Sequence, residues 1–577
     1  MPYLLHHLVS RQARLHPEAL ALTHQDSRCH YEDLAYDVNK LALNLVNLCV
    51  FVCERLAVWL PKRIETVQSL FAASAAGGVL VPINPLLKPA QAAHILADSG
   101  ARILITQRAR LQSLRPLLGQ LHDLRWVILL DDSEELERVP GLGVRAMHEF
   151  SQLPSNHLGL PARTENDLAA LLYTSGSTGM PKGVALTHRN LLAGAASVAH
   201  YLHLESSDRI LAVLPLSFDY GLSQLTTAFH VGAHAIVLDY LLPRDLYKAI
   251  TQHDISVLAG VPTLWHQLAA QDWLDRLGSL RILTNSGGRL PPTIIKRLRS
   301  RLPEAQLFLM YGLTEAFRST YLPADEVDQR PESIGKAIPN AHVHVLRPDG
   351  SRCAPHEAGE LVHCGPTVAR GYWNDPLRSM ERFRPAPTLD ACRSGLGTTE
   401  LCVWSGDQVR MDEDGYLYFI ERHDDQLKTS GYRVSPTEIE DVLYASALVR
   451  EAVALGLADE ALGQRIVAAV VAEHAPLDTE KLMNHCRNHL PAYMQPQAIP
   501  VFSELPLTSN GKVDRHRLRE EIEQLTRTEL ICRRQLSRAP TPRYCLMSAR
   551  VRCCWAARRF VSLPRNWERR FTPMSAG

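Results

Sequence analysis

Short apolar runs alternate with segments of helical periodicity through the first two thirds of the chain. Residues 168–172 (LAALL) form a continuous apolar run of the length of a buried strand, and the segment from His188 onward (HRNLLAGAASVAHYL) carries apolar side chains at helical spacing. This alternation is typical of a layered α/β domain with largely parallel sheets. We expect strands at residues 56–60, 79–82, 210–214, 235–238, 257–259 and 282–285, and helices at residues 31–48 and 64–76.

The pattern changes after residue 359, where short strand-like segments and turns replace long helical ones. Asp349-Gly350 and Asp414-Gly415 are hairpin turn signals, so we expect a β-rich subdomain here. A further α+β pattern follows, with helices expected at residues 436–444 and 480–490 and strands at residues 453–457 and 466–471.

A chain of 577 residues is too long for one hydrophobic core. We predict a large α/β domain with a β-rich subdomain at residues 1–423, a small mobile α+β domain at residues 424–522, and a basic tail at residues 523–577 that we expect to be disordered. From Ile531 onward the tail holds eleven Arg and one Glu, without Lys or Asp. It is interpreted either as a basic arm for membrane or nucleic acid or as an unselected extension, and we favour the second.

Composition gives little reason to expect a membrane or nucleic-acid protein. Outside the tail the chain is mildly acidic, and its most apolar stretch, residues 41–60, is interrupted by Asn, Glu and Arg. The twelve cysteines lack paired zinc spacing, and the N-terminus does not resemble a signal peptide. We therefore expect a cytoplasmic protein with reduced thiols, without a membrane span and without a nucleic-acid partner.

The loop at residues 173–184, YTSGSTGMPKGV, has the composition of a phosphate-binding loop. We predict that it lies between the strand at 168–172 and the helix that follows. Glycine permits unusual backbone conformations, hydroxyls and amides bind phosphate oxygens, and a lysine adds positive charge. The string is not the common P-loop, and the alternative is a flexible Ser/Gly surface loop. The candidate phosphate ligands are Thr174, Ser175, Gly176, Ser177, Thr178, Gly179 and Lys182.

The whole string resembles the signature of AMP-forming acyl-CoA ligases and related adenylating enzymes, and the similarity extends over roughly residues 10–520. The resemblance implies that ATP, with Mg²⁺, activates a carboxylic acid as an acyl-adenylate, and that a thiol of CoA or of a carrier protein's phosphopantetheine then displaces AMP. The wider sequence, including MYGLTEAFRSTYLP and SIGKAIPNA, resembles the acyl-CoA ligases associated with exosortase A systems.

Four further motifs resemble nucleotide-binding motifs of this family. In MYGLTEA the resemblance implies that Tyr311 lies against adenine beside Gly312, that Thr314 contacts phosphate and that Glu315 holds Mg²⁺; a helix cap is the alternative for Thr-Glu. In SGGR, Gly287 and Gly288 match an adenine-side loop, for which a plain turn is the alternative. In WSGD and ERHDD, Asp407 and Arg422 match ribose ligands.

The small domain carries the residues that the family uses after it rotates. Asp424 matches the hinge, Gly431 in KTSGYR matches the glycine that lines the thiol tunnel, and Lys512 in PLTSNGKVDR matches the lysine that bridges the substrate carboxylate and the α-phosphate. A solvated turn lysine is the alternative for Lys512. Glu421 departs from the family's usual glycine before the hinge arginine. Lys428 and Arg433 match positions near the nucleotide.

The acid itself is the least determined part of the prediction. Phe218 and Asp219 lie in SFDYGLS, which resembles the amino-acid-adenylating relatives, where the Asp binds the α-amino group. A buried Asp219 would need a cation partner, which an amino acid would supply; a helix N-cap is the alternative. The substrate is therefore expected to be a carboxylic acid or an amino acid, an acyl carrier protein is a possible partner, and an inactive nucleotide-binding homologue is a third alternative.

Overall fold

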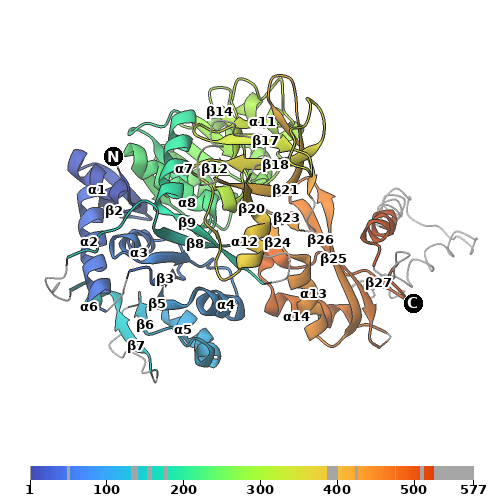
Figure 1. Ribbon diagram of the computed structural model, residues 1–577, viewed down its shortest axis with the longest axis horizontal. Helices are drawn as coiled ribbons and strands as arrows, with labels where there is room; N and C mark the ends of the chain where they lie inside the picture. Colours follow the sequence, from blue (N-terminus) through green and yellow to red (C-terminus); the bar gives the residue numbers. More distant parts are fainter. Residues whose placement is uncertain are drawn as a thin grey trace, which may run out of the picture. The chain divides into compact units, whose positions relative to one another are not determined.

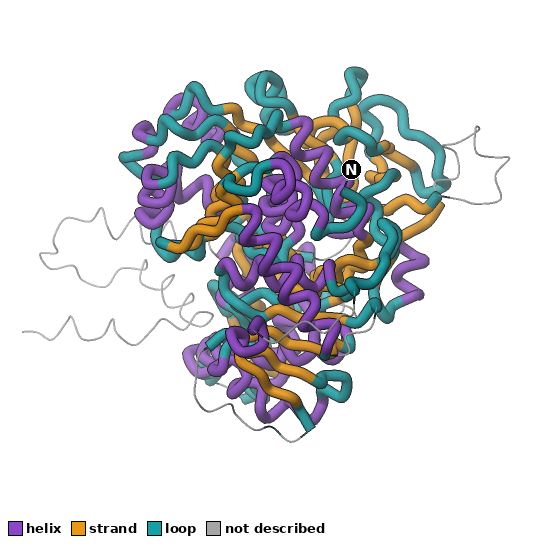
Figure 2. Tube along the Cα trace, turned by 90° about the vertical axis from the view of Figure 1, so that its left-hand side faces the viewer, coloured by secondary structure: helices purple, strands orange, loops and turns teal. Residues whose placement is uncertain are grey.

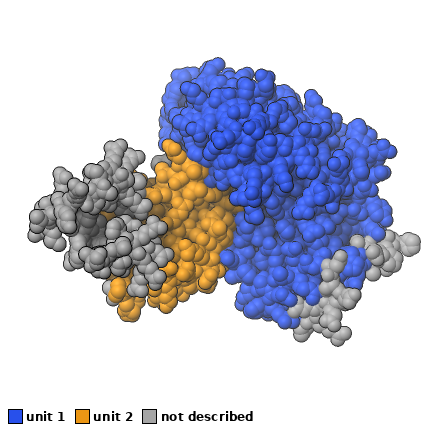
Figure 3. Space-filling model, turned by 180° about the vertical axis from the view of Figure 1, so that it is seen from behind, with its two compact units in different colours: residues 1–175, 181–424 blue, residues 176–180, 425–577 orange. Residues whose placement is uncertain are grey.

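The computed structural model describes residues 2–48, 52–131, 139, 141–152, 159–174, 180–385, 400–422, 426–474, 476–506 and 513–525. The chain forms two compact units (Figure 3). The first comprises residues 1–175 and 181–424, and the second residues 176–180 and 425–577. We describe each unit on its own.

The first sheet of unit 1 has the strand order β19-β9-β8-β4-β3-β5-β6-β7 (Figure 1). From β8 to β7 all neighbours are parallel, and β9 and β19 are antiparallel additions at one edge. The parallel strands are almost entirely apolar because helices cover the sheet. Its strands are β3 (Arg55–Val58), β4 (Val79–Pro82), β5 (Ala101–Thr106), β6 (Trp126–Leu129), β7 (Gly143–Ala146), β8 (Leu168–Thr174), β9 (Lys182–Thr187) and β19 (Gly371–Tyr372).

The second sheet of unit 1 joins a parallel half to an antiparallel half, in the order β17-β18-β21-β22-β16-β15-β14-β13-β12-β10-β11-β1-β2, with β20 paired to β21. The antiparallel half, from β17 to β15, is the β-rich subdomain. The strands are β1 (Leu20–His24), β2 (Ser27–His30), β10 (Arg209–Ala212), β11 (His234–Val237), β12 (Val257–Gly260), β13 (Ile282–Asn285), β14 (Gln306–Tyr311), β15 (Thr320–Leu322), β16 (Ser333–Ala337), β17 (His342–Leu346), β18 (Gly359–Cys364), β20 (Phe383–Pro385), β21 (Leu401–Met411) and β22 (Leu417–Arg422).

The helices of unit 1 pack on the faces of these sheets, as Figure 2 shows. Most of their buried apolar side chains share one large core with the strands, and those of α4 and α5 belong to a second core. The helices are α1 (His7–Leu15), α2 (Tyr31–Asn47), α3 (Ile64–Ala75), α4 (Pro89–Ser99), α5 (Arg108–Leu114), α6 (Met147–Gln152), α7 (His188–Tyr201), α8 (Asp219–Val231), α9 (Pro243–Gln252), α10 (Pro262–Ala269), α11 (Pro292–Arg301) and α12 (Pro376–Arg382).

Unit 2 is an α+β domain with its own buried core. Its sheet has the order β24-β23-β26-β25, with β27 paired to β26. Its elements are β23 (Leu427–Thr429), β24 (Tyr432–Val434), α13 (Pro436–Ala445), β25 (Val449–Asp459), β26 (Gly463–Ala472), α14 (Thr479–His489) and β27 (Val501–Phe502). The predicted fold class, a large α/β domain with a β-rich part and a small α+β domain, is confirmed.

Two sequence-based expectations are wrong. The 173–184 loop was expected to connect a strand to a helix, but residues from Lys182 onward form β9, which pairs antiparallel with β8. The short apolar run GVAL continues the sheet, and α7 begins only after it. The thiols were expected to be reduced throughout, but Cys364 and Cys402 form a disulfide between β18 and β21. These strands place the two cysteines directly opposite each other, with their Cα atoms 4.4 Å apart.

Within the described ranges, no helix is long and apolar enough to cross a membrane. Residues 526–577, most of the predicted basic tail, lie outside the described residues.

Candidate active site

Tyr311 and Asp407, 96 positions apart in the sequence, are joined by a hydrogen bond in which the Tyr311 hydroxyl donates to Asp407 Oδ2. Tyr311 is the last residue of β14, and Asp407 lies in β21 with only 1% of its surface exposed. Arg422 is paired through the backbone with Asp407 across β21 and β22. The structure thus brings together the positions predicted for adenine and ribose.

Lys182 and Glu315 meet at Tyr372. The Tyr372 hydroxyl donates to Glu315 Oε1 at 2.8 Å, and Lys182 Nζ lies 3.9 Å from the centre of the Tyr372 ring. Glu315 is fully buried, which an ionised carboxylate tolerates only with hydrogen bonds or a cation nearby. β19 carries Tyr372 and pairs with β9, the strand that begins with Lys182. The predicted phosphate lysine and the predicted metal carboxylate therefore belong to one cluster.

Thr174 lies opposite Lys182 in the β8–β9 pair. Its buried hydroxyl has no hydrogen-bond partner among the described residues. The other predicted phosphate ligands, Ser175, Gly176, Ser177, Thr178 and Gly179, lie outside the described residues.

The two glycine motifs are explained by local geometry. Gly287 has φ +82°, which favours glycine. Gly288 lies against Pro262, and its carbonyl accepts a hydrogen bond from Asn285 Nδ2 at 3.0 Å. A Cβ atom on Gly312 would lie only 3.2 Å from the Cα of Arg318, so the chain folds back closely just before Thr314 and Glu315. Neither of these two residues is an N-cap; both lie in a short 3-10 helix, Thr314–Ala316.

Asp219 is buried, and its cation partner comes from its own chain. Its Oδ2 lies 3.0 Å from Nη1 of Arg318, and the two side chains are 4% and 2% exposed. Asp219 is the first residue of α8, and Phe218 is the N-cap. The need for a cation partner is therefore met within the chain, by Arg318, without a substrate amine.

Three of the predicted residues of unit 2, Lys428, Gly431 and Arg433, lie in one hairpin. Lys428 lies in β23 and Arg433 in β24, and the two are directly paired. Ser430 and Gly431 have φ of +52° and +81°, the geometry of a tight two-residue turn between these strands. Asp424 and Lys512 lie outside the described residues, as does the side chain of Glu421.

The residues present fit a Mg²⁺ ion brought in by a nucleotide. The described residues contain no group of three or more His, Cys, Asp or Glu that could hold a metal ion on its own. Mg²⁺ in nucleotide sites is held by one or two carboxylates together with phosphate oxygens and water. Glu315, which accepts the hydrogen bond from Tyr372, would provide one such carboxylate.

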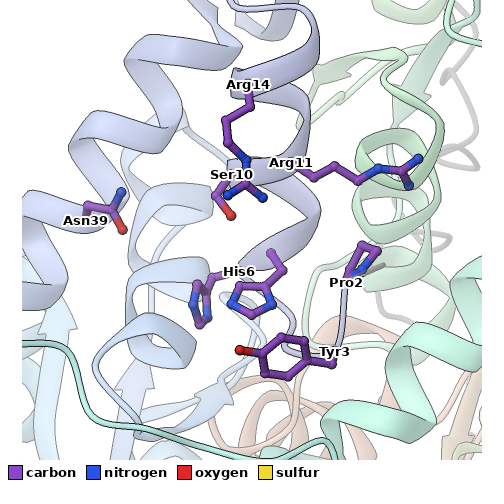
Figure 4. A pocket seen from close by; sticks show the side chains of 8 residues that line it. Pro2, Tyr3, His6, Ser10, Arg11, Arg14 and Asn39 are labelled. Carbon is purple, nitrogen blue, oxygen red and sulfur yellow. The ribbon is translucent and has the colours of Figure 1, made fainter.

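A pocket of about 410 Å³ lies at the N-terminus, beside α1 (Figure 4). It contains none of the residues predicted to bind ATP, the acid or the thiol. Burial lowers the pKa of His6 in its wall to about 3, so that this ring is neutral and hydrogen-bonds to Ser74 at 3.0 Å. The lining residues are Pro2, Tyr3, His6, His7, Ser10, Arg11, Arg14 and Asn39.

Comparison with known proteins shows the family to which the chain belongs. The AMP-binding enzyme family matches residues 9–373, and the AMP-binding enzyme C-terminal domain matches residues 438–512. The chain therefore belongs to the AMP-binding enzymes, which form adenylates. A long-chain-fatty-acid–CoA ligase of Bacillus subtilis is 28% identical over 550 residues, covering 90% of this chain and 94% of the relative. The L-proline–[L-prolyl-carrier protein] ligase of Pseudomonas fluorescens is 31% identical over 529 residues, covering 90% and 99%.

Solved structures share the fold. The o-succinylbenzoate CoA synthetase of Bacillus subtilis has a TM-score of 0.75 at 24% identity, covering 89% of this chain and 97% of the other. The amide bond synthetase McbA of Marinactinospora thermotolerans has a TM-score of 0.77 at 23% identity, covering 90% and 99%. At this level of identity the likeness concerns the fold alone.

Sequence reasoning missed two residues of the site. Tyr372 lies in the string GYWNDP. Nothing in that string indicates a contact with Glu315, 57 positions earlier. Arg318 follows MYGLTEA by two residues, but its pairing with Asp219 spans 99 positions. The signal available in the sequence was Asp219 itself: its own segment holds no nearby basic residue, so a buried Asp219 would need a cation from elsewhere.

Proposed function

We propose that the protein is an ATP-dependent acid–thiol ligase that activates a carboxylic acid without an α-amino group and transfers the acyl group to CoA. The carboxylate oxygen attacks the α-phosphorus of ATP, and the bond to pyrophosphate breaks. The CoA thiol then loses its proton and attacks the acyl carbon, and AMP leaves. The subgroup associated with exosortase A systems is part of this proposal and is supported by sequence resemblance alone.

In this proposal the protein mainly neutralises and aligns charge. Tyr311, with Gly287, Gly288 and Gly312, holds the adenine, and Asp407 with Arg422 holds the ribose. Lys182, Thr174 and Thr314 contact phosphates. Glu315 would hold Mg²⁺, which when bound would supply positive charge at the phosphates. Lys512, Lys428, Arg433 and Gly431 act from the small domain, which pivots at Asp424.

The Asp219–Arg318 ion pair is the observation that favours an acid without an α-amino group as substrate. An α-ammonium group would have to displace a guanidinium that is almost completely buried. Breaking such a pair leaves a buried charge without compensation, which costs about 3–5 kcal/mol. An acid without an amino group leaves the pair intact, so this chain favours that class.

The second candidate is an amino-acid-adenylating enzyme that loads a carrier protein. The 31% identity to the prolyl-carrier protein ligase over nearly its whole length favours it. Here Arg318 would have to move away whenever an amino acid binds to Asp219.

ATP–pyrophosphate exchange, scanned over fatty, aromatic and amino acids, distinguishes these candidates. We expect exchange with acids that lack an α-amino group, followed by formation of acyl-CoA. Exchange confined to amino acids and abolished in Asp219→Ala would support the second candidate. No exchange with any acid would indicate an inactive nucleotide-binding homologue.

A further inference from the structure

Arg318 uses only one end of its guanidinium. Its Nη1 donates to Asp219 Oδ2 and to the carbonyl of Phe317, both at 3.0 Å. The N–H groups of Nε and Nη2 are buried and have no hydrogen-bond partner among the described residues. Because these two nitrogens lie on the same edge of a planar guanidinium, they form a fork of parallel donors.

Leaving such donors without an acceptor is costly, and buried polar groups in native proteins are nearly always paired. The ring of Tyr220 lies 4.6 Å from the guanidinium carbon but offers no acceptor comparable to an oxygen atom. A buried fork of this kind therefore indicates a ligand oxygen.

The backbone fixes Arg318 in an unusual position. Its N–H donates to the carbonyl of Ala316 at 2.6 Å, and the intervening Phe317 has φ +56° and ψ −50°. This is a γ-turn of the strained kind, which persists only where the surroundings enforce it and which is frequent at functional sites. The enforcing contact is the Phe317 ring against Gly194 of α7, where a Cβ atom would lie 2.3 Å from the ring.

Arg318 also lies beside the nucleotide cluster and the ends of the central strands. It follows Glu315 by three residues, and its Cα is close to Gly312. Tyr220, on which it stacks, donates to the carbonyl of Thr284 in β13 at 3.0 Å. The carboxyl ends of parallel strands are where open α/β sheets bind their ligands.

We propose that Nε and Nη2 of Arg318 bind an uncharged oxygen atom of the acid substrate, separate from the reacting carboxylate. The substrate class is thus a hydroxy or keto acid, or another oxygenated carboxylic acid. This rests on the proposed acid-activating function. The oxygen is uncharged because Asp219 already neutralises Arg318, so a second carboxylate would bring an uncompensated charge into a buried site.

The test is ATP–pyrophosphate exchange on the full chain with matched acids. Each unsubstituted acid, such as hexanoate or cinnamate, is compared with its hydroxy and keto derivatives, its α-amino derivative and a dicarboxylate of the same length. We expect the best oxygenated acid to exceed its parent by about 10²-fold or more in kcat/KM, since a site that hydrogen-bonds a substrate oxygen strongly rejects the analogue without it.

A charge-neutral double variant, Asp219→Asn with Arg318→Met, tests the residue without leaving a buried charge. We expect the ratio between oxygenated and parent acid to fall to near 1. The matched control, Asp208→Asn with Arg281→Met, removes a different Asp–Arg pair of unit 1, whose nearest nitrogen and oxygen lie 2.5 Å apart, and should keep the ratio. Thermal unfolding of both variants verifies that they fold.

The outcomes separate this proposal from the function on which it rests. The proposed role of Arg318 is overturned if pyrophosphate exchange is as fast with the parent acids as with the oxygenated acids. It is also overturned if exchange is fastest with amino or dicarboxylic acids. In both cases the proposed adenylating activity still stands. A preference that survives in the double variant also overturns the role of Arg318. If no acid supports exchange, the proposed function itself fails.

Discussion

Tyr372 is the residue that connects the predicted phosphate lysine with the predicted metal carboxylate. Replacement by Phe keeps the ring beneath Lys182 but removes the 2.8 Å hydrogen bond to Glu315. Groups that orient a metal ligand typically contribute about 10–100-fold to metal affinity. We therefore expect Tyr372→Phe to raise the Mg²⁺ concentration needed for half-maximal pyrophosphate exchange by about 10-fold.

The matched control is Tyr31→Phe, which removes another buried tyrosine hydroxyl, the one that donates to the carbonyl of Ala233 at 2.7 Å. Its Mg²⁺ dependence should equal that of the wild type. If Tyr372→Phe leaves the Mg²⁺ dependence unchanged, Glu315 is not held for a metal ion in the way inferred here.

His188 makes stability depend on pH. Burial, and then the charge of Arg163, lowers its pKa to about 4, and its Nδ1 accepts the backbone N–H of Leu5 at 3.1 Å. The unfolded chain takes up this proton near pH 6.5, whereas the folded protein takes it up only near pH 4. Between these values the unfolded state binds more protons, so stability falls as the pH falls. One such histidine lowers the free energy of unfolding by about 2 kcal/mol when the pH falls from 7 to 5.

Urea unfolding at pH 7 and pH 5 measures this loss. We expect His188→Asn, which keeps an acceptor but does not titrate, to lose less stability on acidification than the wild type. His16→Asn, at an exposed position, should behave as the wild type. An unchanged pH dependence in His188→Asn would show that other groups dominate.

At the scale of elements, the disulfide ties β18 to β21, the strand that carries Asp407. Its sulfur atoms lie in a small apolar cluster with Leu346, Val362 and Trp404. The bond closes a loop of 38 residues, for which the loss of chain entropy in the unfolded state predicts a stabilisation of about 2–4 kcal/mol.

We expect a reducing agent, or the variant Cys364→Ser with Cys402→Ser, to lower the free energy of unfolding by that amount. Cys353→Ser removes a free cysteine and serves as control. Should reductant leave the urea midpoint of the wild type unchanged, the two thiols are reduced in solution.

Elements with a strong local pattern were predictable, and contacts across the fold were not. The strand at 79–82 and the helix beginning at 31 were found from periodicity alone, because burial on a sheet or helix face imposes it. β9 was missed because six residues after a glycine-rich loop carry too little pattern to distinguish a strand from a helix start. The partners of Asp219 and Glu315 depend on tertiary packing, which no local pattern encodes.

At the scale of the molecule, the proposed reaction needs both units, because Lys512 belongs to the second and Glu315 to the first. We expect Lys512→Ala to reduce adenylate formation by about 10²-fold or more while sparing thioester formation from a supplied acyl-adenylate, since its charge acts only in the first step. Pyrophosphate exchange measures the first half-reaction and acyl-CoA release the second.

Lys481→Ala, at an exposed position of α14, is the matched control and should affect neither half-reaction. Equal losses in both halves would contradict the assignment of Lys512 to the adenylating step.

The close approach of Gly312 to Arg318 has a consequence for the diversification of such enzymes. In the proposed function, one segment of eight residues, from Tyr311 to Arg318, presents side chains to the nucleotide, the metal and the acid in turn. An insertion or deletion there would displace all three at once. New acid preferences in descendants of this chain should therefore arise by exchange of single side chains around a loop of constant length.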